Sequence, residues 1–224
     1  MIDMHTRAQK LILWFDEISH DDVGLVGGKN ASLGEMYSSL ASKGIPVPKG
    51  FAVTAEAYRK FVSESGLDAI IRRELVGIDT RNIRSLQKKG KKIRAAFLKA
   101  DLPADLVSDI REAYRMLGVL YRSRAVDVAV RSSATAEDLP GASFAGEHET
   151  FLNVRGADDV IAAVRKSFAS LFTDRAISYR VDKGFDHFDV ALSVAVQKMV
   201  QRRGCGFLHT AMDDYPPFGR HVRF

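Results

Sequence analysis

The sequence has little cysteine: Cys205 is the only one among 224 residues. A single cysteine excludes an internal disulfide and any cysteine-based metal cluster, and it fits a reducing compartment. Long hydrophobic runs are also missing, since no apolar stretch approaches the ~20 residues that a membrane-spanning helix needs. Residues 1–7 contain no apolar core of a secretory signal. These absences favour a soluble cytoplasmic protein with no membrane partner.

The chain is mildly basic, with a formal net charge of +5 at pH 7. Its content of 46% hydrophobic and 27% charged residues is typical of a globular protein. The basic residues concentrate between positions 84 and 94, and no aromatic side chain interleaves with them on which a base could stack. A solvated helix face explains this run better than a nucleic-acid surface, so we expect no nucleic-acid partner.

Hydrophobic spacing predicts strands and helices that do not alternate regularly. Such a mixture favours the α+β class over a doubly wound parallel sheet. Residues 67–123 are charged and helical throughout, which suggests a helical insert. The strands are expected at 11–15, 51–53, 126–130, 149–154 and 190–200, and the other helices at 31–43, 55–64 and 158–172.

A glycine-rich loop, residues 23–30, precedes the first predicted helix. Gly27 and Gly28 free the backbone to form an anion-binding concavity. Asn30 is expected to cap the helix, whose first N–H groups and positive dipole end would add to the charge of Lys29. The spacing of a P-loop is not met, so an ordinary turn with a solvated lysine is the alternative for this motif alone.

A second cationic site is predicted where the buried strand at 126–130 ends. Arg131 follows this strand and leads into a long run of small residues that reaches Gly146. The planar fork of an arginine suits phosphate oxygens, and Ser132 and Ser133 add hydroxyl donors to this expected loop. Together with Lys29, such a site would hold a polyphosphate under a loop that closes over it.

Several polar residues leave alternatives open. Arg131 could instead form an ion pair with Glu137 or Asp138, which could also hold Mg²⁺ but more simply begin a helical turn. Gln197, at the end of the last buried strand, could meet the edge of a purine or hydrogen-bond to the backbone. The remaining candidates are lone histidines, His148 and His187, for which a structural role is favoured.

These segments together resemble the phosphoenolpyruvate synthase (pyruvate, water dikinase) family. The resemblance covers about residues 10–200 with little interruption, so chance similarity is remote. It is carried by residues 26–36, 46–54 and 128–140, and it is extended by residues 142–154, 170–180, 184–187 and 194–200.

The resemblance implies an ATP-grasp-like nucleotide-binding lobe over residues 1–200 of a multidomain enzyme. In this family ATP phosphorylates a histidine on a separate domain, and the phosphohistidine then phosphorylates pyruvate in a third domain with Mg²⁺. Carried over by motif, Lys29 and Arg131 would contact the triphosphate. Gly146 and Thr150 would lie along the nucleotide, and Gln197 would approach the adenine.

Residues 201–224 depart from the family pattern. A second ATP-grasp lobe with acidic Mg²⁺ ligands would follow there, but only residues 206–210 faintly keep its expected shape. We therefore expect a truncated or frame-disrupted product with an incomplete second lobe and unassigned metal ligands. Because the phosphohistidine and pyruvate-binding domains are not recognisable, this chain alone is expected to be inactive.

Two other functions fit the same residues. A rifampin phosphotransferase uses a similar ATP domain, although the sequence of residues 29–36 favours the synthase. A non-catalytic nucleotide-binding or interaction fragment is the second alternative. Apolar surface exposed where the second lobe should lie would favour self-association of such a fragment, so a homodimer is among the expected assemblies.

Overall fold

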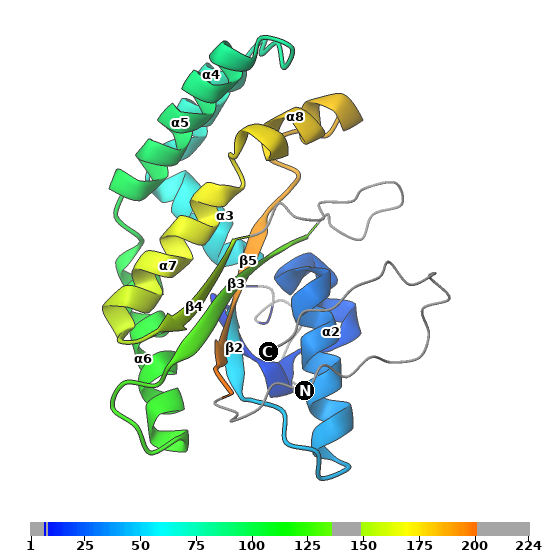
Figure 1. Ribbon diagram of the computed structural model, residues 1–224, viewed down its shortest axis with the longest axis vertical. Coiled ribbons are helices and arrows are strands. Elements are labelled where there is room, and N and C mark those ends of the chain that lie inside the picture. The colour runs from blue at the N-terminus through cyan, green and yellow to red at the C-terminus, as the bar shows by residue number, and fades with distance from the viewer. Residues whose placement is uncertain (1–6, 8, 136–148, 201–224) are drawn as a thin grey trace, which may run out of the picture.

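The computed structural model describes residue 7 and residues 9–135 and 149–200, which form a five-stranded sheet with helices on both faces (Figure 1). The strand order is β1-β2-β5-β3-β4, and every neighbouring pair is antiparallel. This architecture confirms the predicted α+β class. The strands are β1 (Ile12–Trp14), β2 (Gly50–Val53), β3 (Val128–Ala134), β4 (Thr150–Val154) and β5 (Leu192–Lys198).

The predicted helices are present, and the structure adds α8 and two short 3-10 helices that were not predicted. The short 3-10 helices are η1 (Phe15–Glu17) and η2 (His20–Asp22). The α-helices are α2 (Val23–Ala41), α3 (Ala55–Glu64), α4 (Leu67–Leu75), α5 (Ile83–Lys99), α6 (Ala104–Leu120), α7 (Ala157–Ser170) and α8 (Asp174–Lys183). No helix in the described part of the chain is long and apolar enough to cross a membrane.

The two faces of the sheet bury different layers, because successive strand residues point to opposite faces. On one face Leu13, Ala52 and Ala195 pack against Val26 and Ala31 of α2. On the other face the strands pack against buried residues of α3, α5, α6 and α7. Figure 1 shows α2 on one side of the sheet and α7 on the other.

The helices between residues 67 and 120 share the larger core rather than forming one of their own. Their buried residues belong to the same cluster as those of α3 and α7, and the rings of Phe61 and Phe97 meet edge-on with centroids 5.7 Å apart. Lys88, Lys91 and Lys92 of α5 are exposed. The basic run is therefore a solvated helix face, as we predicted from the sequence.

The start of α2 differs from the sequence prediction. Residues 23–30 are not a loop, because α2 begins at Val23 and leaves helical geometry only at Gly27, where φ is 73° and ψ is 160°. Asn30 therefore lies inside the helix and does not cap it. The prediction failed because glycines usually mark loops, whereas here close packing against the sheet favours them within a helix.

The third strand is longer than predicted. We expected it to end at Val130 and Arg131 to open a loop, but β3 continues through Arg131 to Ala134. Strand β5 pairs with all seven of its positions, and β4 pairs with its first half. These neighbours supply the backbone hydrogen bonds that extend β3 beyond its apolar residues.

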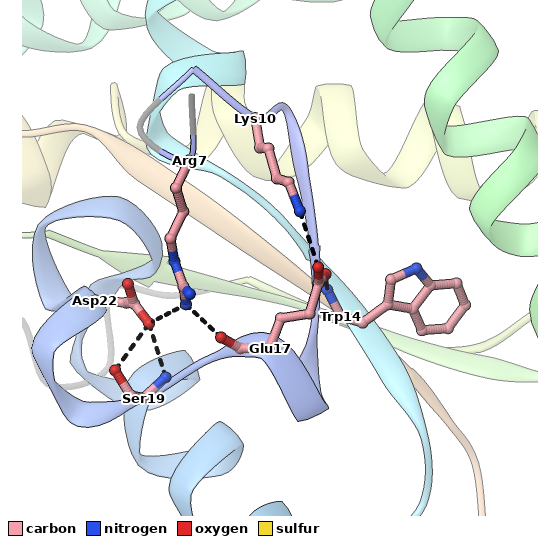
Figure 2. A network of polar contacts seen from close by, with 6 residues as sticks. All are labelled: Arg7, Lys10, Trp14, Glu17, Ser19 and Asp22. Atoms are coloured by element: carbon pink, nitrogen blue, oxygen red, sulfur yellow. Dashed lines mark hydrogen bonds and ion pairs between the residues drawn. The ribbon is translucent and has the colours of Figure 1, made fainter. Parts of the chain in front are cut away.

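Polar contacts hold the N-terminal segment against the start of α2, as Figure 2 shows. The Nη2 atom of Arg7 donates to the Asp22 carboxylate at 2.8 Å and to the backbone carbonyl of Glu17. The same carboxylate accepts from the N–H and hydroxyl of Ser19 at 2.7 and 3.0 Å. The Glu17 carboxylate accepts from the N–H of Trp14 at 2.8 Å. Since Asp22 directly precedes α2, this network fixes where the helix begins.

Candidate functional site

One row of residues crosses the sheet on the face that α2 covers. Directly opposed residues of antiparallel strands share a face. The pairings Ala52↔Ala195, Ala195↔Arg131 and Arg131↔Thr150 therefore form a continuous row. The two alanines are buried under α2, whereas Arg131 and Thr150 are exposed at the other end. The fold thus brings together two of the predicted site residues.

Gln197 lies in a neighbouring row on the same face. Its strand partners are Gly50 on β2 and Ala129 on β3, so only small residues flank its side chain across the sheet. Its Nε2 atom donates to the backbone carbonyl of Pro48 at 3.3 Å. The structure therefore shows the backbone hydrogen bond that we considered as the alternative to a purine contact.

The break in α2 occurs where the helix touches β3. A Cβ atom on Gly27 would lie 2.3 Å from the Oγ of Ser133 and 2.8 Å from the carbonyl oxygen of Ala134. A second helical segment begins after this break, and its first turn contains Gly28 and the exposed Lys29. The first N–H groups of such a segment lack helical partners and carry the positive end of its dipole.

A small polar cluster lies beneath α2 in an otherwise apolar layer. The Nδ2 atom of Asn30 donates to the Oγ of Ser193 at 3.0 Å, and that hydroxyl donates to the carbonyl of Val53 at 2.8 Å. Ser133 is the strand partner of Ser193. Its hydroxyl is buried, and within the described residues it has no hydrogen-bond partner. Buried hydroxyls without a hydrogen-bond partner are rare in folded proteins.

One predicted site residue, Ser132, does not lie on this face. Ser132 alternates to the opposite face beside Val194, and its hydroxyl lies 3.4 Å from the carbonyl of Glu149, to which it donates. Residues 131–134 of the expected phosphate loop are therefore part of a strand, which separates Ser132 from Arg131 and Ser133. Gly146 lies outside the described residues, as do Glu137, Asp138 and His148.

Comparison with known proteins identifies the chain's relatives. Residues 23–214 match the model of the pyruvate phosphate dikinase AMP/ATP-binding domain. The chain belongs to this family. The match ends at residue 214, inside the segment from 201 onward that we set apart as divergent. Membership confirms the resemblance drawn from the sequence motifs and supports ATP as the ligand.

The chain is similar to curated phosphoenolpyruvate synthases. That of Synechocystis sp. is 54% identical over 199 residues, which are 87% of this chain and 24% of the relative. That of Aquifex aeolicus is 50% identical over 195 residues, 87% of this chain and 23% of the relative. That of Escherichia coli is 50% identical over 194 residues, again 87% of this chain and 24% of the relative. The chain spans about a quarter of the length of these relatives.

The end of β5 that carries Gln197 is held by charged groups. The Nζ of Lys198 lies 2.5 Å from the Asp127 carboxylate, and its backbone N–H donates to the carbonyl of Lys49 at 3.0 Å. Lys49 in turn lies 3.0 Å from Asp16, and this hydrogen bond is the main reason that the pKa of Lys49 is raised. These contacts fix the end of β5 that carries Gln197.

His187 has a structural role, as the sequence favoured. Its Nδ1 accepts a hydrogen bond of 3.0 Å from Nε of Arg180, whose side chain is fully buried. The Nη2 atom of Arg180 also donates to the carbonyl of Leu171 at 2.7 Å. Burial, with the nearby Arg180 charge as a second cause, lowers the pKa of His187 to about 4. His187 is thus a neutral acceptor for a buried arginine.

The contact between Asn30 and Ser193 was not predicted from the sequence. Asn30 was placed at the helix start, and Ser193 was not singled out at all. A signal for Ser193 was present, since it is the one polar residue within the apolar run at 190–196. A polar side chain inside a strand that is otherwise wholly apolar needs a partner, and here that partner is Asn30.

Proposed function

We propose that this chain binds ATP on the α2 face of its sheet, as the nucleotide-binding lobe of an ATP-grasp-like enzyme. The observation that carries the proposal is a convergence on one face. An exposed arginine, Arg131, lies in the same layer as the break at Gly27, after which Lys29 and a new helix start follow. A cationic fork, a point charge and free backbone N–H groups are the donors that phosphate chains bind.

Each candidate residue then has a distinct role. Arg131 and Lys29 would hold the triphosphate, with the N–H groups of the turn at Gly28 between them. Thr150, opposite Arg131 in the same row, would lie along the nucleotide, as the family motif implies for Gly146. Gln197 would meet the adenine edge at the far end of the site, giving up or sharing its hydrogen bond to Pro48. The amide suits a purine because it both donates and accepts.

For the complete protein we propose the phosphoenolpyruvate synthase reaction, in which ATP, pyruvate and water give phosphoenolpyruvate, AMP and phosphate. The curated relatives that support it are about four times as long as the matched region, so ATP binding is the part that these residues contribute. The phosphohistidine intermediate and the pyruvate chemistry are proposed for other parts of such a protein. A cytoplasmic location belongs to the same proposal.

Mg²⁺ enters this proposal only as the ion that accompanies the ATP phosphates. Among the residues that the structure describes, no group of three or more His, Cys, Asp and Glu side chains could hold a metal ion. Protein sites for Mg²⁺ often use one or two carboxylates with the substrate's own phosphates. No step is therefore assigned to a metal held by this lobe alone.

Isothermal titration of the folded chain with ATP tests the proposed function. We expect saturable binding of one ATP per chain, weaker binding of adenosine, and no AMP formation when pyruvate is added. The difference between ATP and adenosine measures what the phosphate-binding groups contribute. A folded chain that shows no saturable heat with millimolar ATP contradicts the proposal.

A further inference from the structure

Asn30 links the turn that carries Lys29 to the centre of the sheet. Asn30 is buried, with only 3% of its surface exposed, and its amide donates to the hydroxyl of Ser193 on β5 at 3.0 Å. Ser193 is fully buried and donates to the carbonyl of Val53 on β2 at 2.8 Å. One continuous chain of hydrogen bonds therefore joins α2 to two adjacent central strands.

Both residues oppose the local preferences of their elements. Asparagine is a poor helix former because its side chain competes for backbone groups, and Asn30 places this side chain in a buried, otherwise apolar layer. Ser193 interrupts an apolar strand, where burying an unpaired hydroxyl costs free energy. An alanine or a valine would suit each position better if stability alone were at stake. We therefore attribute the presence of both polar residues to the hydrogen bond between them, which orients α2 relative to the sheet.

The hydrogen bond fixes the rotation of the helical segment that starts after Gly27. Other contacts of α2 with this face are apolar packing of Val26 and Ala31 against Ala52 and Ala195, and the close approach of Gly27 to β3. Apolar contacts are non-directional, whereas a hydrogen bond weakens steeply when its angle changes. Each helical residue turns by about 100°, so a small rotation redirects every side chain and N–H group of the first turn.

We propose that Asn30 and Ser193 are positioning residues for the phosphate chain of ATP. They hold the turn of Gly28 and Lys29 at a fixed angle to Arg131 on β3, so that both cations face the same phosphates. This inference rests on the proposed function, and it adds two residues that would act without touching the nucleotide.

The test compares the affinities of ATP and adenosine in the full chain. We expect Asn30→Ala and Ser193→Ala each to weaken ATP binding by about five- to tenfold, with adenosine affinity unchanged. Because the two residues act as one unit, the double variant should lose no more than either single variant. Ser193→Thr keeps the hydroxyl and suits a strand, so it should restore ATP affinity. This rescue keeps the test decisive if Asn30→Ala does not fold.

The matched control is Ser170→Ala. Its hydroxyl is buried and donates to the carbonyl of Ser167 at 2.6 Å, but it lies in α7 on the opposite side of the sheet. This variant should change thermal stability without changing the ratio of ATP to adenosine affinity. If Ser193→Ala keeps the wild-type ratio while wild-type protein binds ATP, the positioning role is wrong and the proposed function stands. If wild-type protein binds no ATP, the proposed function itself fails.

Discussion

Gly27 of α2 and Ser133 of β3 approach so closely that a Cβ atom on Gly27 would lie 2.3 Å from the Ser133 hydroxyl oxygen. The same atom would lie within 3 Å of two backbone carbonyls of β3, which cannot move aside as a side-chain end can. The φ of 73° at Gly27 is also one that other residues rarely adopt. Position 27 thus requires glycine for two independent reasons, and both set how near the second segment of α2 lies to the sheet.

Replacing Gly27 by alanine should destabilise the fold by about 1–3 kcal/mol, because overpacking and an unfavourable backbone conformation act together. Chemical denaturation of the purified variant measures this loss. Gly24→Ala is the matched control in the same helix, since nothing lies within 4 Å of a Cβ there. Alanine at position 24 should stabilise the helix by up to about 1 kcal/mol. Equal stabilities of the two variants would contradict the packing described here.

Elements set by local signals were predictable from the sequence. Thr54 directly precedes α3, a position that favours a capping threonine, and its Oγ1 accepts a hydrogen bond from the N–H of Ala57 at 3.3 Å. Gly44 follows the end of α2, where glycine is favoured, and its φ is 74°. Caps and positive-φ glycines depend on a few neighbouring residues, so a single sequence reveals them.

Elements set by distant contacts were not predictable. The length of β3 depends on β4 and β5, which follow it in the chain, and neither pairing is visible in the residues around Arg131. Asn30 is of a residue type that commonly caps helices, yet its side chain instead donates to Ser193 on β5. In the candidate site, too, features set by neighbouring residues were predictable and features set by distant contacts were not. Its cations were recognisable by their glycine neighbours, whereas the face they share became evident only from strand register.

The ion pair of Lys198 and Asp127 should contribute strongly to stability. Their charged atoms are 2.5 Å apart, and the two side chains are only 17% and 10% exposed. Removing one partner of a buried pair leaves a poorly solvated charge, so Lys198→Met should lower the free energy of unfolding by about 3 kcal/mol. The double variant with Asp127→Asn should recover part of this loss. Equilibrium unfolding in urea measures both.

Lys60→Met is the control for that ion pair. Lys60 lies 2.7 Å from Glu64 and 3.1 Å from Asp105, but its partners are about half exposed. Exposed ion pairs contribute little because water and salt screen their charges, so this variant should have little effect. A loss at Lys60 as large as that at Lys198 would show that burial is not what makes the Lys198 pair important.

His187 should make stability depend on pH. Its pKa falls from 6.5 to about 4 on folding, chiefly through burial and secondly through Arg180, while Asp186 opposes the shift. The unfolded chain therefore binds more protons than the folded chain between these values. The contribution of neutral His187 to the free energy of unfolding should be fully present above pH 6.5 and be lost as the pH falls toward 4. Allowing for the partial exposure of the ring, the loss should reach about 1–2 kcal/mol.

Urea denaturation at pH 7 and pH 5 of His187→Gln tests this dependence. Glutamine can accept the hydrogen bond of Arg180 without titrating, so its stability should change less than the wild-type value between the two pH values. His20→Gln is the control, because it makes the same substitution at a histidine whose side chain is exposed. The control should keep the wild-type pH dependence. An unchanged dependence in His187→Gln would contradict the proposed origin.

Arg131→Ala should weaken ATP binding by about ten- to a hundredfold, since a charged hydrogen bond contributes about 1.5–3 kcal/mol. Thermal stability should hardly change, because the side chain is exposed on the sheet face. Arg131→Lys keeps the charge but loses the planar fork, so its affinity for ATP should lie between those of the wild-type protein and Arg131→Ala. Arg115→Ala is the control: Arg115 is also exposed, but it pairs with Glu112 on α6 at 2.7 Å and should leave ATP affinity unchanged. If Arg131→Ala binds ATP as tightly as this control, the row that joins Arg131 to Thr150 is not the phosphate side of the site, and Lys29 would have to hold the phosphates from the helix alone.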